Sequence, residues 1–478
     1  MRTLVGVLAS LLLVAIARYV PAADKLNVVL IAVDDMNCDV GCYGHPLVKT
    51  PAIDRLAARG VRFDRAYCQY PVCNPSRVSM LSGRRPDTAG VFDLVTPPRT
   101  YLRDAVFLPE YFRQQGYTTA HIGKIYHTGD PQEDPQSWDF ETREWGKHPP
   151  QEAVIREQRI ERPEKYYVEW NELRSSDEET ADGAVARQSS ELLDKLVKDT
   201  KPFLLGVGFR RPHSPYAAPK RYFDIYPVET IPPLVEPAAH LQGIPPVALT
   251  YPRDVPLLSA HERAETVAAY WACISFVDAQ IGIVLDALDR NDLWKNTIVV
   301  FYSDHGYHLG EHGGLWHKMT LFEESARVPL VIAAPNIAGG GRVCNRVVEL
   351  VDIYPTLVQL APLPPMKGLE GASLCPLLDD PADGSHRWHK AASTQVVHGG
   401  VVGRSIRTER FRYIEWDGGS AGVELYDHDN DPREFVNLSG DPQFADVRSH
   451  LHKRVQPERD AKKVPPATPK PPPTTGSN

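Results

Sequence analysis

The sequence has no surplus of basic residues. Its 53 lysines and arginines are outnumbered by 61 aspartates and glutamates, which gives a formal net charge of −8. A protein that binds nucleic acid mainly through phosphate contacts needs the opposite balance, because its affinity comes from neutralising phosphates. The composition therefore argues against nucleic acid as the main partner. It still allows a local basic pocket that binds a small anion.

The cysteines do not form an obvious disulfide framework. There are seven of them, so at least one thiol stays unpaired. A chain of 478 residues is also long enough to bury a core without disulfides. Most of the cysteines are expected to be small buried apolar side chains, and their pairing is left open. An unpaired cysteine in an exported chain nevertheless needs an explanation.

A long uninterrupted apolar run occurs only near the N-terminus. Arg2 precedes an apolar stretch at residues 4–17, and small residues follow at 21–23. This pattern is typical of a secretory signal peptide, and the run is short for a bilayer span. We therefore expect residues 1–23 to be a signal peptide. The mature protein would be secreted or periplasmic (lysosomal in an animal host), with no stable membrane insertion.

Short apolar runs separated by helical patterns indicate an α/β fold. The runs are continuous rather than alternating, as in strands buried on both faces of a mostly parallel sheet. The expected strands are 27–33, 118–122, 202–209, 297–303 and 328–333. The expected helices are 51–59, 108–115, 181–198, 262–289 and 351–360. This alternation predicts a large sheet flanked by helices.

The chain divides into a large and a small unit. Short antiparallel strands are expected at 401–406, 411–416 and 423–426. We expect a main domain over 24–384, a C-terminal α+β subdomain with an antiparallel sheet over 385–456, and a disordered proline-rich tail over 457–478. The stretch 212–256 is rich in proline and irregular. A loop of that length in a packed domain often forms a wall or lid over a site.

Charged side chains follow four of the expected strands. In an open α/β sheet, ligands bind beyond the carboxyl ends of the strands. The residues that follow these strands are Asp34 and Asp35, then Lys124 and His127, then His213, and finally Asp304 and His305. We therefore expect them to meet at one edge of the sheet.

Three of these residues are aspartates, which would repel one another without a cation. Asp34, Asp35 and Asp304 offer hard oxygen ligands that suit Ca²⁺ or Mg²⁺, and His305 adds a nitrogen. Aspartate pairs more commonly cap helices or turns. Two such sites directly after buried strands nevertheless favour a metal.

The glycine-rich stretch 306–318 contains three further histidines. The spacing of His308 and His312 matches a helical metal-binding pair, but the surrounding glycines argue against a helix. We expect a loop in which these two histidines and His317 make local hydrogen bonds. Lys318, at the end of the stretch, is the side chain expected to reach the site.

Several basic side chains accompany the aspartates. Taken singly, Lys124, His127 and Lys318 would each be a solvated charge. Together with Arg77 they supply enough positive charge to hold a tetrahedral oxyanion that sits on a metal.

The stretch CNPSRVSMLSGR, residues 73–84, is the most specific motif in the chain. It matches C-x-P-S-R-x-x-x-L-S-G-R at every position and resembles the motif of the type I sulfatases. GKIYH, RRPHSPY and SDHGYHLGEHG resemble the iduronate-2-sulfatase group of that family. The resemblance covers most of residues 25–440 and implies the alkaline-phosphatase-like α/β fold, with the main domain as the catalytic domain.

The resemblance implies a function and two cofactors. In that family a separate formylglycine-generating enzyme oxidises the cysteine to formylglycine, whose hydrate attacks the sulfur of a sulfate ester. The implied enzyme is a sulfuric ester hydrolase acting on a sulfated saccharide, with a 2-O-sulfated uronic acid of a glycosaminoglycan as first choice and algal polysaccharide close behind. The implied metal is one Ca²⁺, with Mg²⁺ second, bound by Asp34, Asp35, Asp304, His305 and the modified Cys73. Whether His305 contacts the metal or only the sulfate stays open.

The resemblance also assigns roles to the other residues. Arg77 would stabilise the hydrate and the sulfate, and Lys124 and Lys318 would hold sulfate oxygens. His127 would orient or deprotonate the hydrate. His213 would protonate the leaving oxygen, with Lys318 as the alternative.

Other functions stay open. A phosphodiesterase or phosphonate hydrolase could use the same scaffold, and some of these also use formylglycine. A polysaccharide-binding protein with an inactive site is a third possibility, but the intact acidic pairs and the intact C-x-P-S-R argue against it. Arg84, Arg85 and Asp87 are expected either to recognise a sugar carboxylate or to form a structural salt bridge.

Overall fold

The computed structural model describes most of the chain between residues 25 and 459. The described residues are 25–127, 133–142, 153–161, 167–249, 258–383, 388 and 390–459. The expected signal peptide lies outside these ranges, and so does the expected tail from residue 460 onward.

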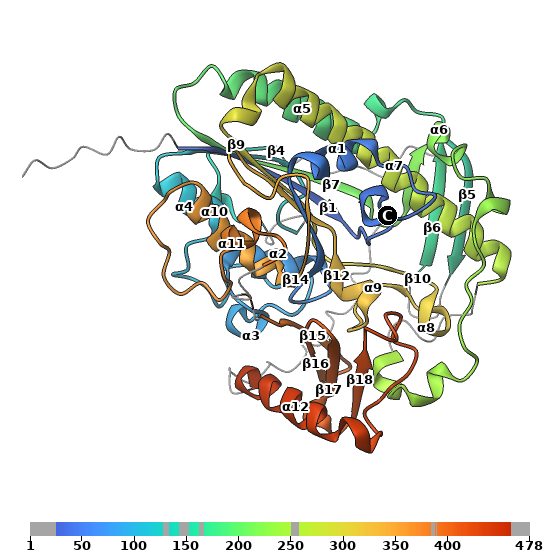
Figure 1. Cartoon of the computed structure of the whole chain (residues 1–478). Helices are drawn as coiled ribbons and strands as arrows, with labels where there is room; N and C mark the ends of the chain where they lie inside the picture. Colours follow the sequence, from blue (N-terminus) through green and yellow to red (C-terminus); the bar gives the residue numbers. More distant parts are fainter. Residues whose placement is uncertain are drawn as a thin grey trace, which may run out of the picture.

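Within the described residues, a nine-stranded sheet runs through the centre of the molecule (Figure 1). Its order is β12-β2-β13-β9-β1-β7-β3-β4, and β14 also pairs with β2. The expected strands are present as β1 (Asn27–Asp34), β3 (Thr118–Gly123), β7 (Phe203–Pro212), β9 (Thr297–Ser303), β12 (Arg327–Val328) and β13 (Leu330–Ala333). The strands that sequence reasoning missed are β2 (Val61–Tyr67), β4 (Phe140–Thr142) and β14 (Val343–Glu349).

The central strands are parallel, as their continuous apolar runs predicted. β1 pairs in parallel with β7 and β9, and β3 pairs in parallel with β7 and β4. β13 is antiparallel to both β9 and β2, so the whole sheet is mixed. Because β1, β3, β7 and β9 run the same way, the residues that follow them emerge at one edge of the sheet.

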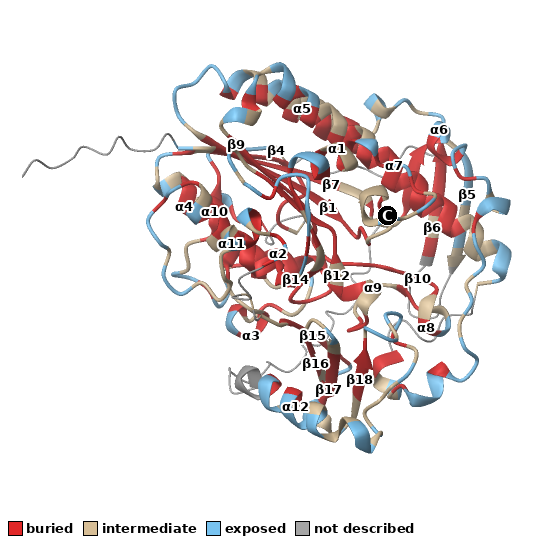
Figure 2. Ribbon diagram, in the orientation of Figure 1, coloured by how far each residue is buried: buried red, intermediate tan, exposed pale blue. Residues whose placement is uncertain are grey.

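Helices cover both faces of this sheet, and β1 contributes to both cores. Its residues Val29, Ile31 and Val33 belong to one core, together with α1 (Pro51–Arg59), α5 (Ala181–Leu196) and α7 (Ala260–Arg290). Alternate residues of β1 face the second core, together with α2 (Cys73–Ser82), α4 (Leu108–Gln114), α10 (Ile353–Leu360) and α11 (Cys375–Asp379). Figure 2 shows the strands as a continuous buried layer between these helices.

Helix α7 is long and apolar enough to cross a membrane by length and composition alone. In the most apolar 18-residue window of this helix, however, 83% is buried inside the protein. The helix begins with a capping box formed by Ser259 and Glu262 and runs for 31 residues. Its apolar composition is therefore that of a core helix, buried on nearly all sides.

A four-stranded antiparallel sheet follows the main sheet. It consists of β15 (Ala392–His398), β16 (Val401–Arg407), β17 (Phe411–Trp416) and β18 (Gly422–Asp427). Helix α12 (Ala445–Arg459) packs on it through Leu451 and Val455. Three of the four strands were predicted, and β15 was missed. The domain boundary expected at residue 385 stays a prediction.

The proline-rich stretch 212–256 is more structured than expected where it is described. It contributes β8 (Tyr216–Pro219) to a three-stranded sheet with β5 (Val154–Glu161) and β6 (Tyr167–Leu173). It also contains α6 (Lys220–Phe223) and the short 3₁₀ turn η7 (Pro246–Leu249).

The cysteines are all unpaired thiols in this structure. Four of them are buried and three are partly buried: Cys68, Cys73, Cys273 and Cys344, then Cys38, Cys42 and Cys375. Most of them therefore behave as the small buried side chains that the sequence indicated.

Gly208 on β7 lies close to the backbone of Lys124. A Cβ added there would lie 2.1 Å from the carbonyl oxygen of Lys124, so the backbone would have to shift. We expect Gly208→Ala to lower the free energy of unfolding by about 1–3 kcal/mol, measured by urea titration. Gly440→Ala is the matched control, because its added Cβ would meet no described atom within 4 Å. Equal losses in the two variants would contradict this close packing.

Candidate active site

The residues predicted at the strand ends come together at one edge of the main sheet. At this edge, the described residues form two overlapping clusters whose potential ligand atoms all lie within 4.8 Å of one another. They are Asp34, Asp35, Cys73 and His213, and Asp34, Cys73, Asp304 and His305. Strands β1, β7 and β9 and the start of helix α2 therefore deliver side chains to one buried point.

Cys73 lies at the centre of both clusters. It is the first residue of α2 and is buried. Its Sγ lies 3.4 Å from Nε2 of His305 and 3.4 Å from Nζ of Lys318. The distance from Sγ to Oδ1 of Asp35 is 3.9 Å. Any atom at the end of this side chain is therefore in contact with both acidic and basic groups.

The surroundings of Cys73 favour negative charge on its side chain. Burial alone would raise the pKa of the thiol. The ammonium groups of Lys124 and Lys318, with hydrogen bonds from His127 and His213, instead hold that pKa well below its usual value. The two histidines are thus within hydrogen-bond reach of residue 73, as the sequence predicted.

Arg77 ties the cluster together from one turn further along α2. Its Nε donates to Oδ2 of Asp304 at 2.8 Å, and its Nη2 donates to Oδ1 of Asp34 at 3.2 Å. Its Nη1 donates to the carbonyl oxygen of Lys124 at 2.6 Å. All three side chains of this salt-bridged group are fully buried. One guanidinium therefore fixes the ends of β1, β3 and β9 relative to α2.

Two lysines pair with the two aspartates at the end of β1. Lys124 pairs with Asp34, and Lys318 pairs with Asp35. Lys318 comes directly after the hairpin of β10 (His308–Leu309) and β11 (Trp316–His317). Although burial favours the neutral amine, Asp35 and Cys73 raise the pKa of Lys318 above its usual value. Lys318 therefore carries its proton beside residue 73.

Asp304 and His305 follow β9 directly. Oδ1 of Asp304 accepts the N–H groups of His305 at 3.1 Å and of Asp35 at 3.2 Å. The Ser76 hydroxyl donates to the carbonyl oxygen of Asp304 at 2.5 Å. Nδ1 of His305 lies 2.9 Å from the carbonyl oxygen of Gly306, while its Nε2 lies 3.3 Å from Oδ1 of Asp35. The Nε2 nitrogen therefore points into the cluster.

The acidic groups fit a divalent cation that prefers oxygen ligands. Asp34, Asp35 and Asp304 are at most 1% exposed, and buried carboxylates need compensating charge. Ca²⁺ and Mg²⁺ take carboxylate ligands of this kind, whereas structural zinc sites are built from cysteine and histidine. The donor set therefore fits Ca²⁺ or Mg²⁺.

The histidines of the glycine-rich stretch make local hydrogen bonds, as expected. The ring-nitrogen contacts are His308 to the Thr320 hydroxyl (2.7 Å), His312 to a Glu324 carboxylate oxygen (3.3 Å) and His317 to the Tyr307 hydroxyl (2.7 Å). The turn between β10 and β11 contains a short distorted helix, α8 (Glu311–Gly314), in which His312 has a φ of 50°. No regular helix aligns His308 with His312 in this described segment.

The residues that follow the cysteine motif form structural salt bridges. The Arg85 guanidinium donates to both carboxylate oxygens of Glu349, at 2.7 and 2.6 Å. Asp87 accepts hydrogen bonds from Arg404 at 3.1 Å and from Gln395 at 3.1 Å. Of the two expectations for Arg85 and Asp87, the structure favours the structural one.

Tyr270 on α7 supports the site and was missed by sequence reasoning. Its hydroxyl donates to the carbonyl oxygen of Asp35 at 2.7 Å and accepts the N–H of Asn37 at 2.9 Å. These contacts hold Asp35 in a left-handed conformation with a φ of 66°. In the sequence, Tyr270 is one of many apolar residues on a core helix, so no pattern marks it.

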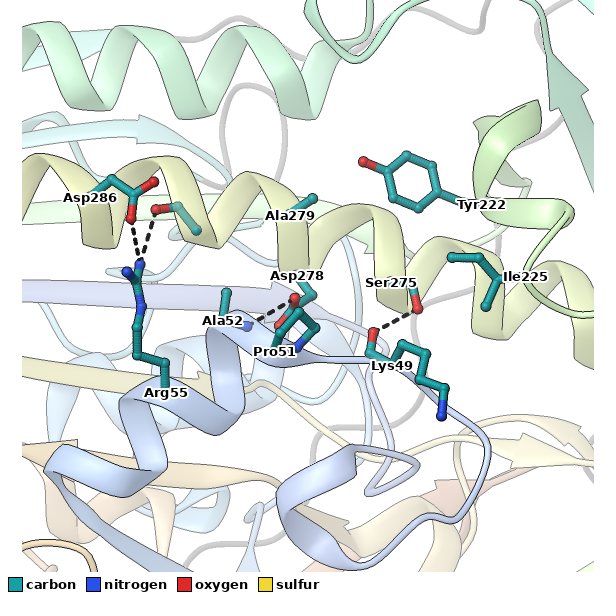
Figure 3. A pocket seen from close by; sticks show the side chains of 11 residues that line it. Lys49, Pro51, Ala52, Arg55, Tyr222, Ile225, Ser275, Asp278, Ala279 and Asp286 are labelled. Atoms are coloured by element: carbon teal, nitrogen blue, oxygen red, sulfur yellow. Dashed lines mark hydrogen bonds and ion pairs between the residues drawn. The ribbon is translucent and has the colours of Figure 1, made fainter.

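A separate cavity of about 500 Å³ lies between α1, α6 and α7 (Figure 3). Its lining includes Lys49, Arg55, Tyr222 and Ile225 and none of the predicted site residues. Asp278 in its wall accepts the N–H groups of Ala52 at 3.1 Å and Ile53 at 2.8 Å, so this carboxylate caps the start of α1. The cavity is therefore distinct from the cluster around Cys73.

Comparison with known families decides the class of this protein. The family model described as Sulfatase matches residues 26–363, which is more than half of the chain. The chain belongs to the sulfatase family. A second model, described as the C-terminal domain of N-sulphoglucosamine sulphohydrolase, matches residues 310–461. The two matches together span the main sheet and the C-terminal four-stranded sheet of this sulfatase.

Two relatives extend over nearly the whole chain. A sulfatase of Formosa agariphila is 34% identical, and the match covers 88% of this chain and 84% of the relative. The iduronate 2-sulfatase of Mus musculus is 32% identical, with 90% and 94% covered. The resemblance to type I sulfatases, including iduronate-2-sulfatase, is therefore confirmed, and the protein is a hydrolase of sulfate esters.

Solved structures have the same fold. A protein in complex with its substrate D-glucosamine-2-N,6-O-disulfate is 23% identical, with a TM-score of 0.72 over 91% of this chain and 98% of that chain. The phosphonate monoester hydrolase of Agrobacterium radiobacter is 25% identical, with a TM-score of 0.76 over 91% and 96%. The expected fold, a large sheet flanked by helices with a smaller C-terminal antiparallel sheet, is confirmed.

The buried position of Arg77 predicts a large stability loss when it is removed. Arg77→Gln leaves buried Asp304 without its arginine and buried Asp34 with Lys124 alone. We therefore expect the free energy of unfolding to fall by about 3–5 kcal/mol, measured in EDTA. Arg55→Gln is the control, because Arg55 is 38% exposed and pairs with Asp286 on the surface. We expect that variant to lose less than about 1 kcal/mol. Losses of similar size in both variants would contradict the stabilising role of the buried Arg77.

Proposed function

We propose that this sulfatase removes sulfate from a sulfated carbohydrate, with residue 73 as the nucleophile. The observation that carries this proposal is the meeting of Cys73 with three carboxylates and with basic side chains at one buried point. A sulfate ester is an anion, and its negative charge repels nucleophiles. A site rich in fixed cations offsets that repulsion and stabilises the charge that develops as sulfur is attacked.

We propose that a formylglycine-generating enzyme converts Cys73 to formylglycine. The complete C-x-P-S-R motif supports this assignment. The hydrated aldehyde would supply one hydroxyl to attack sulfur and a second to expel sulfate afterwards, which a serine could not do. The position at the start of α2 is favourable, because helix N-termini stabilise anions.

The basic side chains hold the sulfate in this proposal. The ammonium group of Lys318 already lies 3.4 Å from Sγ of residue 73, and Lys124 lowers the pKa of that thiol as well. Both lysines would bind sulfate oxygens. Arg77, which contacts Asp34 and Asp304, would stabilise the hydrate and the bound sulfate while it holds the ligand set in place.

The two histidines beside residue 73 carry protons in this proposal. Burial lowers the pKa of His127, so the ring is neutral at pH 7 and can take a proton from the nucleophile. Nδ1 of His213 lies 2.6 Å from the carbonyl oxygen of Ser214. Because Nδ1 donates to that carbonyl oxygen, the proton for the leaving oxygen would come from Nε2 of the doubly protonated ring, which would return to the neutral form; Lys318 is the alternative donor.

We propose that the site holds one Ca²⁺, with Mg²⁺ as the second choice. Asp34, Asp35, Asp304 and residue 73 would be its ligands, and His305 would contact either the metal or the sulfate. When bound, the cation would neutralise the carboxylates and polarise both the nucleophile and the sulfate.

The substrate we favour is a 2-O-sulfated uronic acid of a glycosaminoglycan. The similarity to an iduronate 2-sulfatase across 90% of the chain supports it. Sulfated algal polysaccharide is the second choice. Hydrolysis of a phosphonate or phosphate diester is a separate alternative, which the fold shared with a phosphonate monoester hydrolase supports. Arg2 and the apolar stretch that follows it support export, which we also propose.

Sulfate release from defined saccharides tests the reaction. We expect protein co-expressed with a formylglycine-generating enzyme to release sulfate from a disaccharide with a 2-O-sulfated uronate. Ion chromatography would measure the free sulfate, and mass spectrometry would measure the conversion of residue 73. The panel also contains sulfated algal oligosaccharides and a phosphonate monoester.

Cys73→Ala is the matched control, and we expect it to release no sulfate. Cleavage of another sulfated sugar would contradict the proposed substrate but leave the proposed reaction intact. Converted protein that cleaves the phosphonate and no sulfate ester would overturn the proposed reaction.

Metal binding can be tested without measuring activity. We expect EDTA-treated protein to unfold at a lower temperature, and added Ca²⁺ to restore stability by about 2.7 kcal/mol at a concentration one hundred times its Kd. Asp35→Asn, which removes one ligand charge, should need more Ca²⁺ for the same shift. If neither Ca²⁺ nor Mg²⁺ moves the unfolding temperature of the native protein, the proposed metal site is wrong.

A further inference from the structure

The residue that follows Lys318 has an uncommon backbone conformation. Met319 has a φ of 73°, and His317 on the other side of the lysine has a φ of 69°. A left-handed conformation costs a non-glycine residue roughly 1–2 kcal/mol. Such a conformation persists only when neighbouring contacts hold it. Lys318 therefore extends from a backbone whose shape depends on other parts of the molecule.

Two hydrogen bonds hold the backbone of Met319. Its N–H donates to the carbonyl oxygen of Pro71 at 3.1 Å, just before the Cys73 motif. Its carbonyl oxygen lies 2.5 Å from Nε2 of His398. Met319 thus joins the C-terminal sheet to the segment that leads into α2, and Lys318 lies next to this junction.

His398 is well placed to fix this junction. It is the last residue of β15, is only 5% exposed and packs against the Trp416 ring with 5.0 Å between ring centroids. Its Nδ1 lies 2.9 Å from the carbonyl oxygen of Val247 in η7. A neutral imidazole has one N–H to donate, and a protonated one has two. The contact with Met319 is the shorter of the two.

We propose that His398 is a positioning residue for Lys318. By holding the Met319 carbonyl it maintains the left-handed turn that directs the lysine ammonium group to Asp35 and residue 73. This inference rests on the proposed role of Lys318 in holding sulfate. The C-terminal sheet then acts on the reaction through a backbone contact, and η7 of the proline-rich stretch is anchored by the same ring.

A double-mutant cycle between His398 and Lys318 tests the proposal. We expect His398→Ala to lower kcat by up to about 100-fold, because a misplacement near 1 Å can cost that much. In a Lys318→Ala background the same change should have little further effect, because its action passes through Lys318. A purely structural role would instead give the same loss in both backgrounds, and that result would overturn the proposal.

Two further variants separate positioning from folding. Met319→Gly adopts the left-handed conformation without cost, so adding it to His398→Ala should restore part of the lost kcat. His398→Gln keeps a side-chain N–H donor and should retain more activity than His398→Ala, which keeps the proposal testable if the alanine variant does not fold. His452→Ala, on α12, is the control histidine and should leave kcat unchanged. No recovery by either Met319→Gly or His398→Gln would argue against positioning.

The test also distinguishes this inference from the proposed function. If Lys318→Ala alone keeps the native kcat, the proposed role of Lys318 fails, and the inference fails with it. If Lys318→Ala lowers kcat while a folded His398→Ala keeps it, only the role of His398 is overturned.

Discussion

The fully buried pairing of Arg77 with Asp34 and Asp304 is the interaction on which the rest of the site depends. Parallel strands bring aspartates together at one edge, and without a fixed cation they would repel one another in a medium of low dielectric. A guanidinium can contact two carboxylates and a backbone carbonyl at once, which an ammonium group cannot do as rigidly. Arg77 thereby links α2 to the sheet and keeps a compact cluster of buried charges compatible with a folded core.

Much of the main sheet was predictable because its strands are continuous apolar runs, and so was the convergence of charged residues at their ends. β2 was missed because Arg62, Asp64 and Arg65 interrupt its apolar pattern, with Arg62 and Asp64 pairing on its outer side. Tyr270 and His398 could not be found either. Each acts through a backbone group more than 70 residues away in the sequence, and only the folded chain brings these partners together.

The histidines illustrate how context decides what a side chain does. His305 follows a buried strand directly and faces the carboxylates, whereas His308, His312 and His317 lie on a hairpin whose glycines direct them to local partners. The spacing of His308 and His312 alone matched a helical metal-binding pair, but the surrounding glycines predicted a loop instead. The position of each residue relative to the ends of the strands was the more reliable guide, because strand direction determines which side chains meet.

The near-complete burial of Cys73 has a consequence for how the protein is made. The side chain is 1% exposed and is enclosed by α2, the lysines and the ends of the strands. The converting enzyme proposed above could not reach this side chain in the folded protein, so the proposed conversion would have to precede folding. Under the proposed function, molecules that fold before residue 73 is converted would be stably folded but inactive. The fraction of active enzyme would then depend on the rate of conversion relative to the rate of folding, and not on the stability of the folded protein.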